Sequence, residues 1–187
     1  MRTRSILFGI LVAFVSMISI HAQTSVSKKK ILVAYFSHSG NTRFVANQIK
    51  NATGGDIFEI QSVKPYPQDY QTVVDQAKRE INSNYKPALK TKISNIRQYD
   101  VIFIGSPNWW STIAPPVATF LSSYNLEGKT IVPFMTHEGT RMGHSVLDIK
   151  KLCPKSTVLE GLSIRGGDVG RSRSDVEKWL RKLELEK

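Results

Sequence analysis

The sequence predicts an α/β domain in which a five-stranded parallel sheet carries helices on both faces. Short continuous apolar runs, typical of strands buried on both faces, alternate with stretches whose apolar residues recur at helical spacing. This alternation repeats about five times, as expected for a parallel sheet with crossover helices. The length of 187 residues, with 41% hydrophobic and 22% charged residues, suits a single globular domain.

The first residues predict a secretory leader that is not part of the fold. Arg2 and Arg4 precede an apolar run over residues 6–20, and the small residue Ala22 follows it. The run is shorter than the roughly 20 apolar residues of a membrane span. Cleavage and export to the periplasm or outside the cell are therefore favoured, and an uncleaved membrane anchor formed by residues 6–20 is the alternative. The expected organisation is a signal peptide (1–22), a short linker (23–29) and one domain (30–187).

The first half of the domain opens with the apolar run Ile-Leu-Val-Ala-Tyr-Phe at residues 31–36, a strand buried on both faces. A helix is expected over 42–51, a second strand over 56–60 and a helix over 70–81. Residues 82–98 predict no regular element. Long loops in compact domains are often functional.

The second half continues the alternation. In chain order we expect a strand over residues 101–104, a helix opened by Pro115 and Pro116, a strand over 130–135, a helix over 146–152, an uninterrupted strand over 157–164 and a capped helix over 174–183. Pro133 inside the fourth strand is unusual, because proline has no N–H to donate and prefers sheet edges or bulges.

Ligands of such sheets bind beyond the carboxyl ends of the strands, so the loops after the first, third and fourth strands are the candidate site. The first of them feeds directly into a helix, whose N-terminal N–H groups attract anions. Ser37, Ser39 and Thr42 add hydroxyl donors, and Gly40 lets the backbone approach a ligand closely. The loop is neither a Walker loop nor a G-x-G-x-x-G loop. It predicts a phosphate site built from neutral donors, and a plain helix cap by Ser39 or Asn41 is the alternative.

The run Tyr35-Phe36-Ser37-x-Ser39-Gly40-Asn41-Thr42 resembles the FMN phosphate loop of flavodoxins. The resemblance continues in four further stretches, Tyr99-Asp100-Val101-Ile102-Phe103-Ile104-Gly105-Ser106-Pro107-x-Trp109-Trp110, Phe120-Leu121, Gly128-Lys129-Thr130 and Pro133-Phe134-x-Thr136. It covers nearly the whole domain and is most specific for flavodoxin-like proteins with a P-x-W-W loop. It implies a flavodoxin-like three-layer sandwich with strand order 2-1-3-4-5, and non-covalent FMN.

The resemblance assigns three loops to the cofactor. The phosphate would be held by Ser37, His38, Ser39, Gly40, Asn41 and Thr42, with His38 contributing its backbone N–H. The isoalloxazine ring would lie against Ser106, Pro107, Asn108, Trp109 and Trp110. Trp109 is expected to stack and Trp110 to support the loop, and packing of both beneath the Pro115–Pro116 turn is the alternative. The backbone of Thr136, His137, Glu138 and Gly139 would cap the pyrimidine edge.

The third loop departs from the family pattern. Many relatives have a small Ser/Gly-rich run where this chain has His137, Glu138 and Arg141. A basic loop would favour an anionic reduced flavin and raise the potential at which it forms. For His137, a solvated loop histidine is the alternative.

An electron-transfer protein is the leading functional prediction, with the redox chemistry carried by FMN and no catalytic side chain assigned. An FMN-dependent NAD(P)H quinone or nitro-compound reductase of the same fold is the alternative. A binding protein without redox function is a third hypothesis. No His, Asp or Glu cluster has metal-ligand spacing. The single Cys153 excludes an internal disulfide and is expected to be a small buried apolar residue.

The number and distribution of charged residues limit the kinds of binding partner that we expect. The chain has 26 Lys and Arg against 15 Asp and Glu, a net charge of +11, and the leader carries two positive charges and no acidic residue, which leaves +9. The basic residues are scattered, as in Lys28 to Lys30 and Lys86 to Lys92, and form no stripe with interleaved aromatics, so nucleic acid is not expected. An acidic redox partner is expected, with the protein a monomer or weak dimer and not stably inserted in a membrane if the leader is cleaved.

Overall fold

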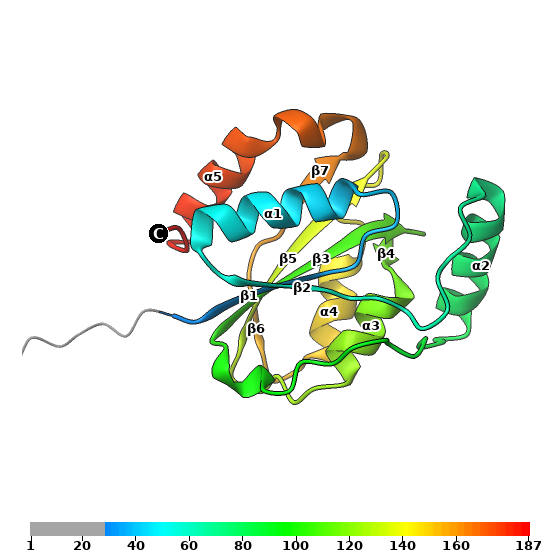
Figure 1. Cartoon of the computed structure of the whole chain (residues 1–187), viewed down its shortest axis with the longest axis horizontal. Helices are drawn as coiled ribbons and strands as arrows, with labels where there is room; N and C mark the ends of the chain where they lie inside the picture. Colours follow the sequence, from blue (N-terminus) through cyan, green and yellow to red (C-terminus); the bar gives the residue numbers. More distant parts are fainter. Residues whose placement is uncertain (1–28) are drawn as a thin grey trace, which may run out of the picture.

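The computed structural model describes residues 29–187, which form a central sheet between two layers of helices (Figure 1). The predicted leader and most of the predicted linker lie outside the described residues. Within residues 29–187, no helix combines the length and the apolarity that crossing a membrane requires.

Five parallel strands form the body of the sheet, in the order β2-β1-β3-β5-β6. They are β1 (Ile31–Tyr35), β2 (Asp56–Glu59), β3 (Val101–Trp109), β5 (Thr130–His137) and β6 (Thr157–Val158). Two further short strands, β4 (Thr112–Ile113) and β7 (Leu162–Arg165), pair with β3 and β5. The predicted order 2-1-3-4-5 is confirmed, with β5 as the fourth strand of that scheme and β6 with β7 as the fifth.

The prediction of an uninterrupted fifth strand is wrong. Between the register pairs Ile131–Val158 and Phe134–Leu162, β5 has two residues, whereas the segment that joins β6 to β7 has three. This mismatch is a β-bulge. Pro133 is one of the two, and it has no N–H to donate across this edge. The proline that looked out of place in the sequence therefore lies at the break.

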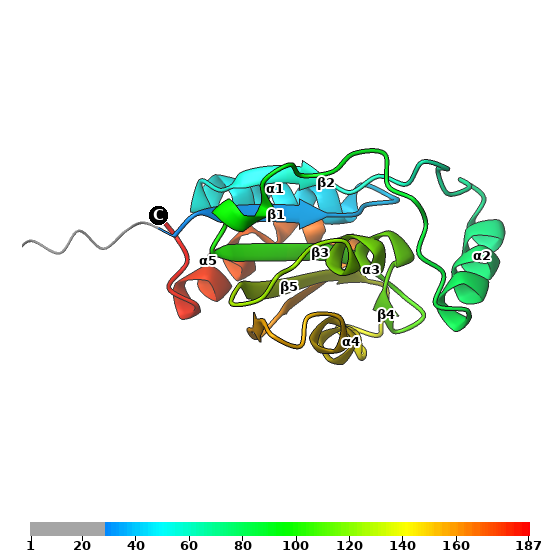
Figure 2. The same ribbon diagram turned by 90° about the horizontal axis from the view of Figure 1, so that it is seen from below.

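Helices cover both faces of the sheet (Figures 1 and 2). On one face lie α1 (Asn41–Thr53) and α5 (Arg173–Lys182), and on the other lie α3 (Pro115–Ser122) and α4 (Ser145–Leu152). Alternate residues of a strand point to opposite faces. Val33 and Phe103 accordingly belong to the core under α1 and α5, whereas Leu32 and Ile102 belong to the core under α3 and α4. This is why these strands are apolar along their whole length.

One helix projects beyond the carboxyl edge of the sheet. It is α2 (Tyr70–Asn82), drawn at the right of Figures 1 and 2, and only Val73 and Ala77 of its side chains are buried. The indole Nε1 of Trp110 donates to the Val74 carbonyl at 3.0 Å. This bond joins α2 to the end of β3.

The chain between α2 and β3 is the long loop that the sequence predicted. It contains a short 3-10 helix at Ile96–Gln98, and its Leu89 forms an isolated bridge with Ser62.

The predicted cap of the last helix is not found. Ser172 precedes α5 but makes no side-chain cap, and its hydroxyl donates to the Val169 carbonyl instead.

Candidate functional site

The first loop joins β1 to α1 through a glycine. Gly40 is the N-cap residue, with φ 95°, and no side chain caps the helix. Its N–H donates to Ser37 Oγ at 3.1 Å. The alternative of a cap by Ser39 or Asn41 is therefore wrong, and the first-turn N–H groups are not engaged by a capping side chain. A positive φ favours glycine, and an uncapped helix N-terminus attracts anions.

Thr42 links the first loop to the third. Its side chain is only 1% exposed, and its Oγ1 lies 2.8 Å from Oγ1 of Thr136, which is 4% exposed. The Thr42 hydroxyl is thus engaged inside the protein. The backbone N–H of this residue lies in the first turn of α1, where it has no partner within the helix.

His38 fastens the first loop to its surroundings. Its Nε2 lies 2.8 Å from the carbonyl oxygen of Pro67, in the segment before α2. Its ring meets Trp109 edge-on, with centroids 5.9 Å apart. The role expected for its backbone N–H stays a prediction.

The second loop is a β-hairpin, which the sequence did not predict. β3 extends to Trp109, and β4 returns antiparallel to it after the two residues Trp110 and Ser111. These residues have φ 50° and φ 65°. Positive φ at both turn positions is typical of two-residue hairpins, but the usual signal is Asn-Gly, which is absent here. A non-glycine residue in this region costs roughly 1–2 kcal/mol.

The two tryptophans have different surroundings. Trp109 is half-buried and packs edge-on against Phe36 and Tyr66, at centroid distances of 5.5 and 5.0 Å. Trp110 is exposed, bonds α2 and has the ammonium of Lys78 at 4.7 Å from its ring centroid. Trp110 therefore connects α2 with the hairpin, whereas Trp109 is held by the aromatic side chains beside the first loop. Stacking of Trp109 on a flavin stays a prediction.

The third loop follows β5 and carries charged residues. Burial lowers the pKa of His137, the positive charges of Arg141 and Arg165 lower it further, and the nearby carboxylate of Glu138 opposes them. Glu138 is exposed and lies 4.0 Å from the Arg165 guanidinium. A side chain at Gly166 would collide with Glu138 and with Asn41, so this glycine lets the loop after β7 approach both.

Two buried polar atoms in these loops have no hydrogen-bond partner. Asn108 donates through Nδ2 to the Arg141 carbonyl at 2.7 Å, but its Oδ1 has none, and neither does Nδ1 of His137. An unsatisfied buried polar atom costs about 1–3 kcal/mol. Both lie in loops that the sequence predicts to hold a ligand, and polar groups of a bound ligand would satisfy them.

The structure therefore brings the three predicted loops together at the carboxyl edge of the sheet. Their contacts are Thr42 with Thr136, His38 with Trp109, and Asn108 with Arg141. No sequence pattern predicts a role for Tyr66, whose ring packs against Trp109 from the segment before α2. No group of three potential metal-ligating side chains occurs among residues 29–187.

Known proteins share sequence and fold with this chain. A family model described as flavodoxin matches residues 30–183. A protein of Bacteroides eggerthii assigned as a flavoprotein is 34% identical, with a TM-score of 0.75, over 84% of this chain and 99% of its own. One from Bacteroides uniformis, likewise assigned, is 30% identical, with a TM-score of 0.74, over 82% of this chain and 98% of its own.

A flavoprotein of Lactobacillus acidophilus solved in complex with FMN is 27% identical, with a TM-score of 0.64, over 81% of this chain and 98% of its own. No curated protein matched the sequence. The family match spans most of the chain and includes all three loops of the site. The chain therefore belongs to the flavodoxin family.

Proposed function

We propose that this protein binds FMN non-covalently at the three loops and serves in electron transfer. The observation that carries the proposal is the uncapped N-terminus of α1, which lies at the same edge as two buried polar atoms without partners. FMN supplies the redox chemistry by accepting and donating electrons.

The first loop would hold the phosphate mainly with neutral groups. The N–H groups at the start of α1 and the hydroxyls of Ser37 and Ser39 are donors, and the helix dipole adds a partial positive charge. Thr42 would contribute its N–H, because its hydroxyl is bonded to Thr136.

The second and third loops would hold the ring. Asn108 Oδ1 is an acceptor, and His137 Nδ1 donates or accepts depending on the tautomer. The pyrimidine part of a flavin presents an N–H and carbonyl oxygens along one edge, so it can satisfy both atoms. Trp109, held by Phe36 and Tyr66, offers a flat face nearby.

The charges beside the third loop would favour negative charge on the cofactor. Arg141 and Arg165 are exposed on this loop and on the end of β7. Positive potential stabilises an added electron, so we expect a higher midpoint potential than a loop without these arginines would give.

A matched pair of glycine variants tests FMN binding at the first loop. Gly40 (φ 95°) and Gly128 (φ 72°) both have positive φ, and a Cβ at either position would meet no atom within 4 Å. Gly128 precedes β5, at the other end of the strands. Both Gly→Ala changes should destabilise the protein by roughly 1 kcal/mol through backbone strain.

Only Gly40→Ala should weaken FMN binding, by about tenfold or more, since strain at Gly40 would displace the adjoining N–H groups at the start of α1 that would bind the phosphate. Affinity is measured by quenching of flavin fluorescence on reconstitution of the apoprotein. A wild-type protein that binds no flavin, or equal losses in both variants, would refute the proposal.

A reductase is the second candidate, and one cavity favours it. A cavity of about 540 Å³ lies beside the hairpin, with Thr112, Ile113 and Tyr85 in its lining. Its size is within the ordinary range of small-molecule sites. His144 also lines it, with Nδ1 2.7 Å from Asp148 Oδ2. NAD(P)H-driven turnover of a quinone by the FMN-loaded protein would distinguish a reductase from a carrier, which needs a protein partner.

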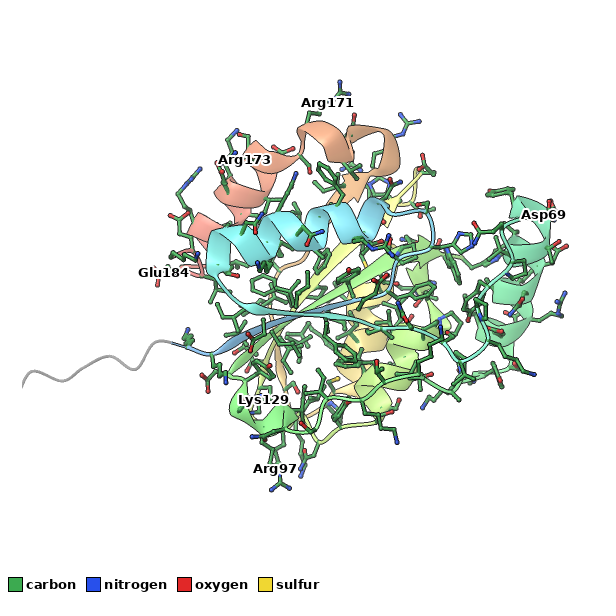
Figure 3. All side chains as sticks on the ribbon, viewed as in Figure 1. Asp69, Arg97, Lys129, Arg171, Arg173 and Glu184 are labelled. Carbon is green, nitrogen blue, oxygen red and sulfur yellow. The ribbon has the colours of Figure 1, made fainter. Side chains whose placement is uncertain are left out.

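Export and an acidic redox partner are further parts of the proposal. The basic residues 2 and 4 and the apolar run over 6–20 support export. Arg171 and Arg173 lie along one side of the molecule and Arg97 and Lys129 at another, which shows how widely the positive charge is spread (Figure 3). The charge supports long-range attraction of an acidic partner. Salt-dependent rates of electron exchange with acidic and basic partner proteins would test this.

A further inference from the structure

A cavity of about 210 Å³ lies between the first loop and the segment that follows β2. In the sheet order, β1 lies between β2 and β3. The flavin loops follow β1, β3 and β5, whereas this cavity is lined by residues of the first loop and of the segment that follows β2. Its polar lining includes Ser37, His38, Arg43, Ser62 and Lys90.

Ser62 is a buried donor without a partner. The residue is 6% exposed, lines the cavity, and its Oγ has no hydrogen-bond partner. A buried hydroxyl in this state costs about 1–3 kcal/mol. The cavity is far larger than the roughly 10–15 Å³ that one water needs, so it has room for an anion beside the residue that carries this hydroxyl.

Lys90 is brought to the cavity by the long loop between α2 and β3. The Lys90 N–H donates to the Gln61 carbonyl at 2.8 Å, and the Val63 N–H donates to the Ala88 carbonyl at 2.8 Å. These two bonds flank the bridge between Ser62 and Leu89. A loop without regular structure is thus fixed at one place, where its lysine and Ser62 line the same cavity.

The charges around the cavity leave one positive charge in excess. Arg43 donates to Glu59 Oε1 at 2.5 Å, so these two charges neutralise each other. Lys90 forms no ion pair with any residue of the described range. The lining therefore carries one unpaired cation beside the Ser62 residue.

We propose that this cavity is a second oxyanion site, which binds a phosphoryl group beside the one held by the first loop. Lys90 and Ser62 are its recognising side chains. The site goes beyond the proposed function, because the single phosphate of FMN is already placed at α1. A phosphoryl group here has two sources, free inorganic phosphate or the second phosphate of a dinucleotide flavin.

The first experiment titrates inorganic phosphate into FMN-saturated protein and follows broadening of the free phosphate signal by 31P NMR. Lys90→Gln should weaken phosphate binding by about tenfold or more, as expected for a charge-assisted hydrogen bond. Ser62→Ala should weaken it as well, without destabilising the phosphate-free protein, because it removes an unsatisfied hydroxyl. Lys92→Gln is the matched control, since Lys92 is exposed on the same loop but does not line the cavity.

The second experiment identifies the source by comparing FAD and FMN affinities. If the dinucleotide is the source, Lys90→Gln weakens FAD binding and leaves FMN binding unchanged. If free phosphate is the source, the variant leaves both flavins unchanged and acts on phosphate alone. Unchanged phosphate and FAD binding in both Lys90→Gln and Ser62→Ala would overturn the proposal. Failure of the wild type to bind FMN would instead overturn the proposed function, and the phosphate titration without FMN would still test Lys90.

Discussion

The buried hydroxyl pair Thr42–Thr136 gives a sharp test of how the site is held together. Valine has nearly the shape of threonine but no hydroxyl, so Thr42→Val leaves the Thr136 hydroxyl without a partner, and Thr136→Val does the reverse. The oxygens are 2.8 Å apart and the residues 1% and 4% exposed, so water cannot take the place of the lost group.

Each single variant should lower the free energy of unfolding by about 1–3 kcal/mol, which combines a lost hydrogen bond with an unsatisfied buried group. The double variant has no unsatisfied hydroxyl and should lose less than either single variant. The coupling energy between the two positions is therefore expected to be about 1–3 kcal/mol.

Urea unfolding of the apoprotein measures these quantities, with the m-value as a check that the unfolding transition is unchanged. Thermal unfolding should agree, at about 2–4 °C per kcal/mol for a chain of this size. Additive single effects, with coupling below about 0.5 kcal/mol, would refute the pairing. FMN affinity adds a second criterion. If Thr42→Val alone weakens binding by more than tenfold, the Thr42 hydroxyl serves the phosphate and not Thr136.

Three further predictions concern buried groups. Gly105→Ala should lower the free energy of unfolding by about 1–3 kcal/mol through overpacking, because the added Cβ would lie 2.2 Å from the ring of Phe134. Adding Phe134→Leu should recover part of this loss, as measured by urea unfolding. His137 binds a proton less readily in the folded than in the unfolded state, since burial lowers its pKa; stability should therefore fall as the pH drops from about 6.5 towards the lowered pKa, and His137→Gln should remove this slope. Burial raises the pKa of Cys153 to about 11, so a thiol reagent at pH 8 should modify it only after unfolding.

The elements that the sequence predicted well are those with local signals. β1 and the first part of β3 are apolar without interruption because both faces of the sheet are covered. The proline pair at 115–116 begins α3, where proline's missing N–H costs nothing. The three loops of the site could be located because all of them follow parallel strands.

The parts that escaped prediction depend on contacts distant in sequence or on unusual backbone conformations. The pair Thr42–Thr136 joins positions 94 residues apart, and no local pattern marks it. The hairpin after β3 was missed because Trp110 and Ser111 adopt positive φ without the glycine that normally indicates such a turn. The bulge opposite Pro133 was indicated by the proline itself, but its position in the neighbouring strand follows only from the register.

The lysine-rich loop shows how register turns scattered charge into a defined site. In the sequence, Lys86, Lys90 and Lys92 are three basic residues among many and are typical of a solvated surface. The structure pairs Lys90 with Gln61 and Ala88 with Val63 through their backbones. Successive side chains of an extended segment point to opposite sides, so a shift by one residue would turn Lys90 away from the cavity and Leu89 towards it. The net charge of the chain therefore says little about its anion sites, which depend on backbone pairing and on uncharged N–H and hydroxyl groups.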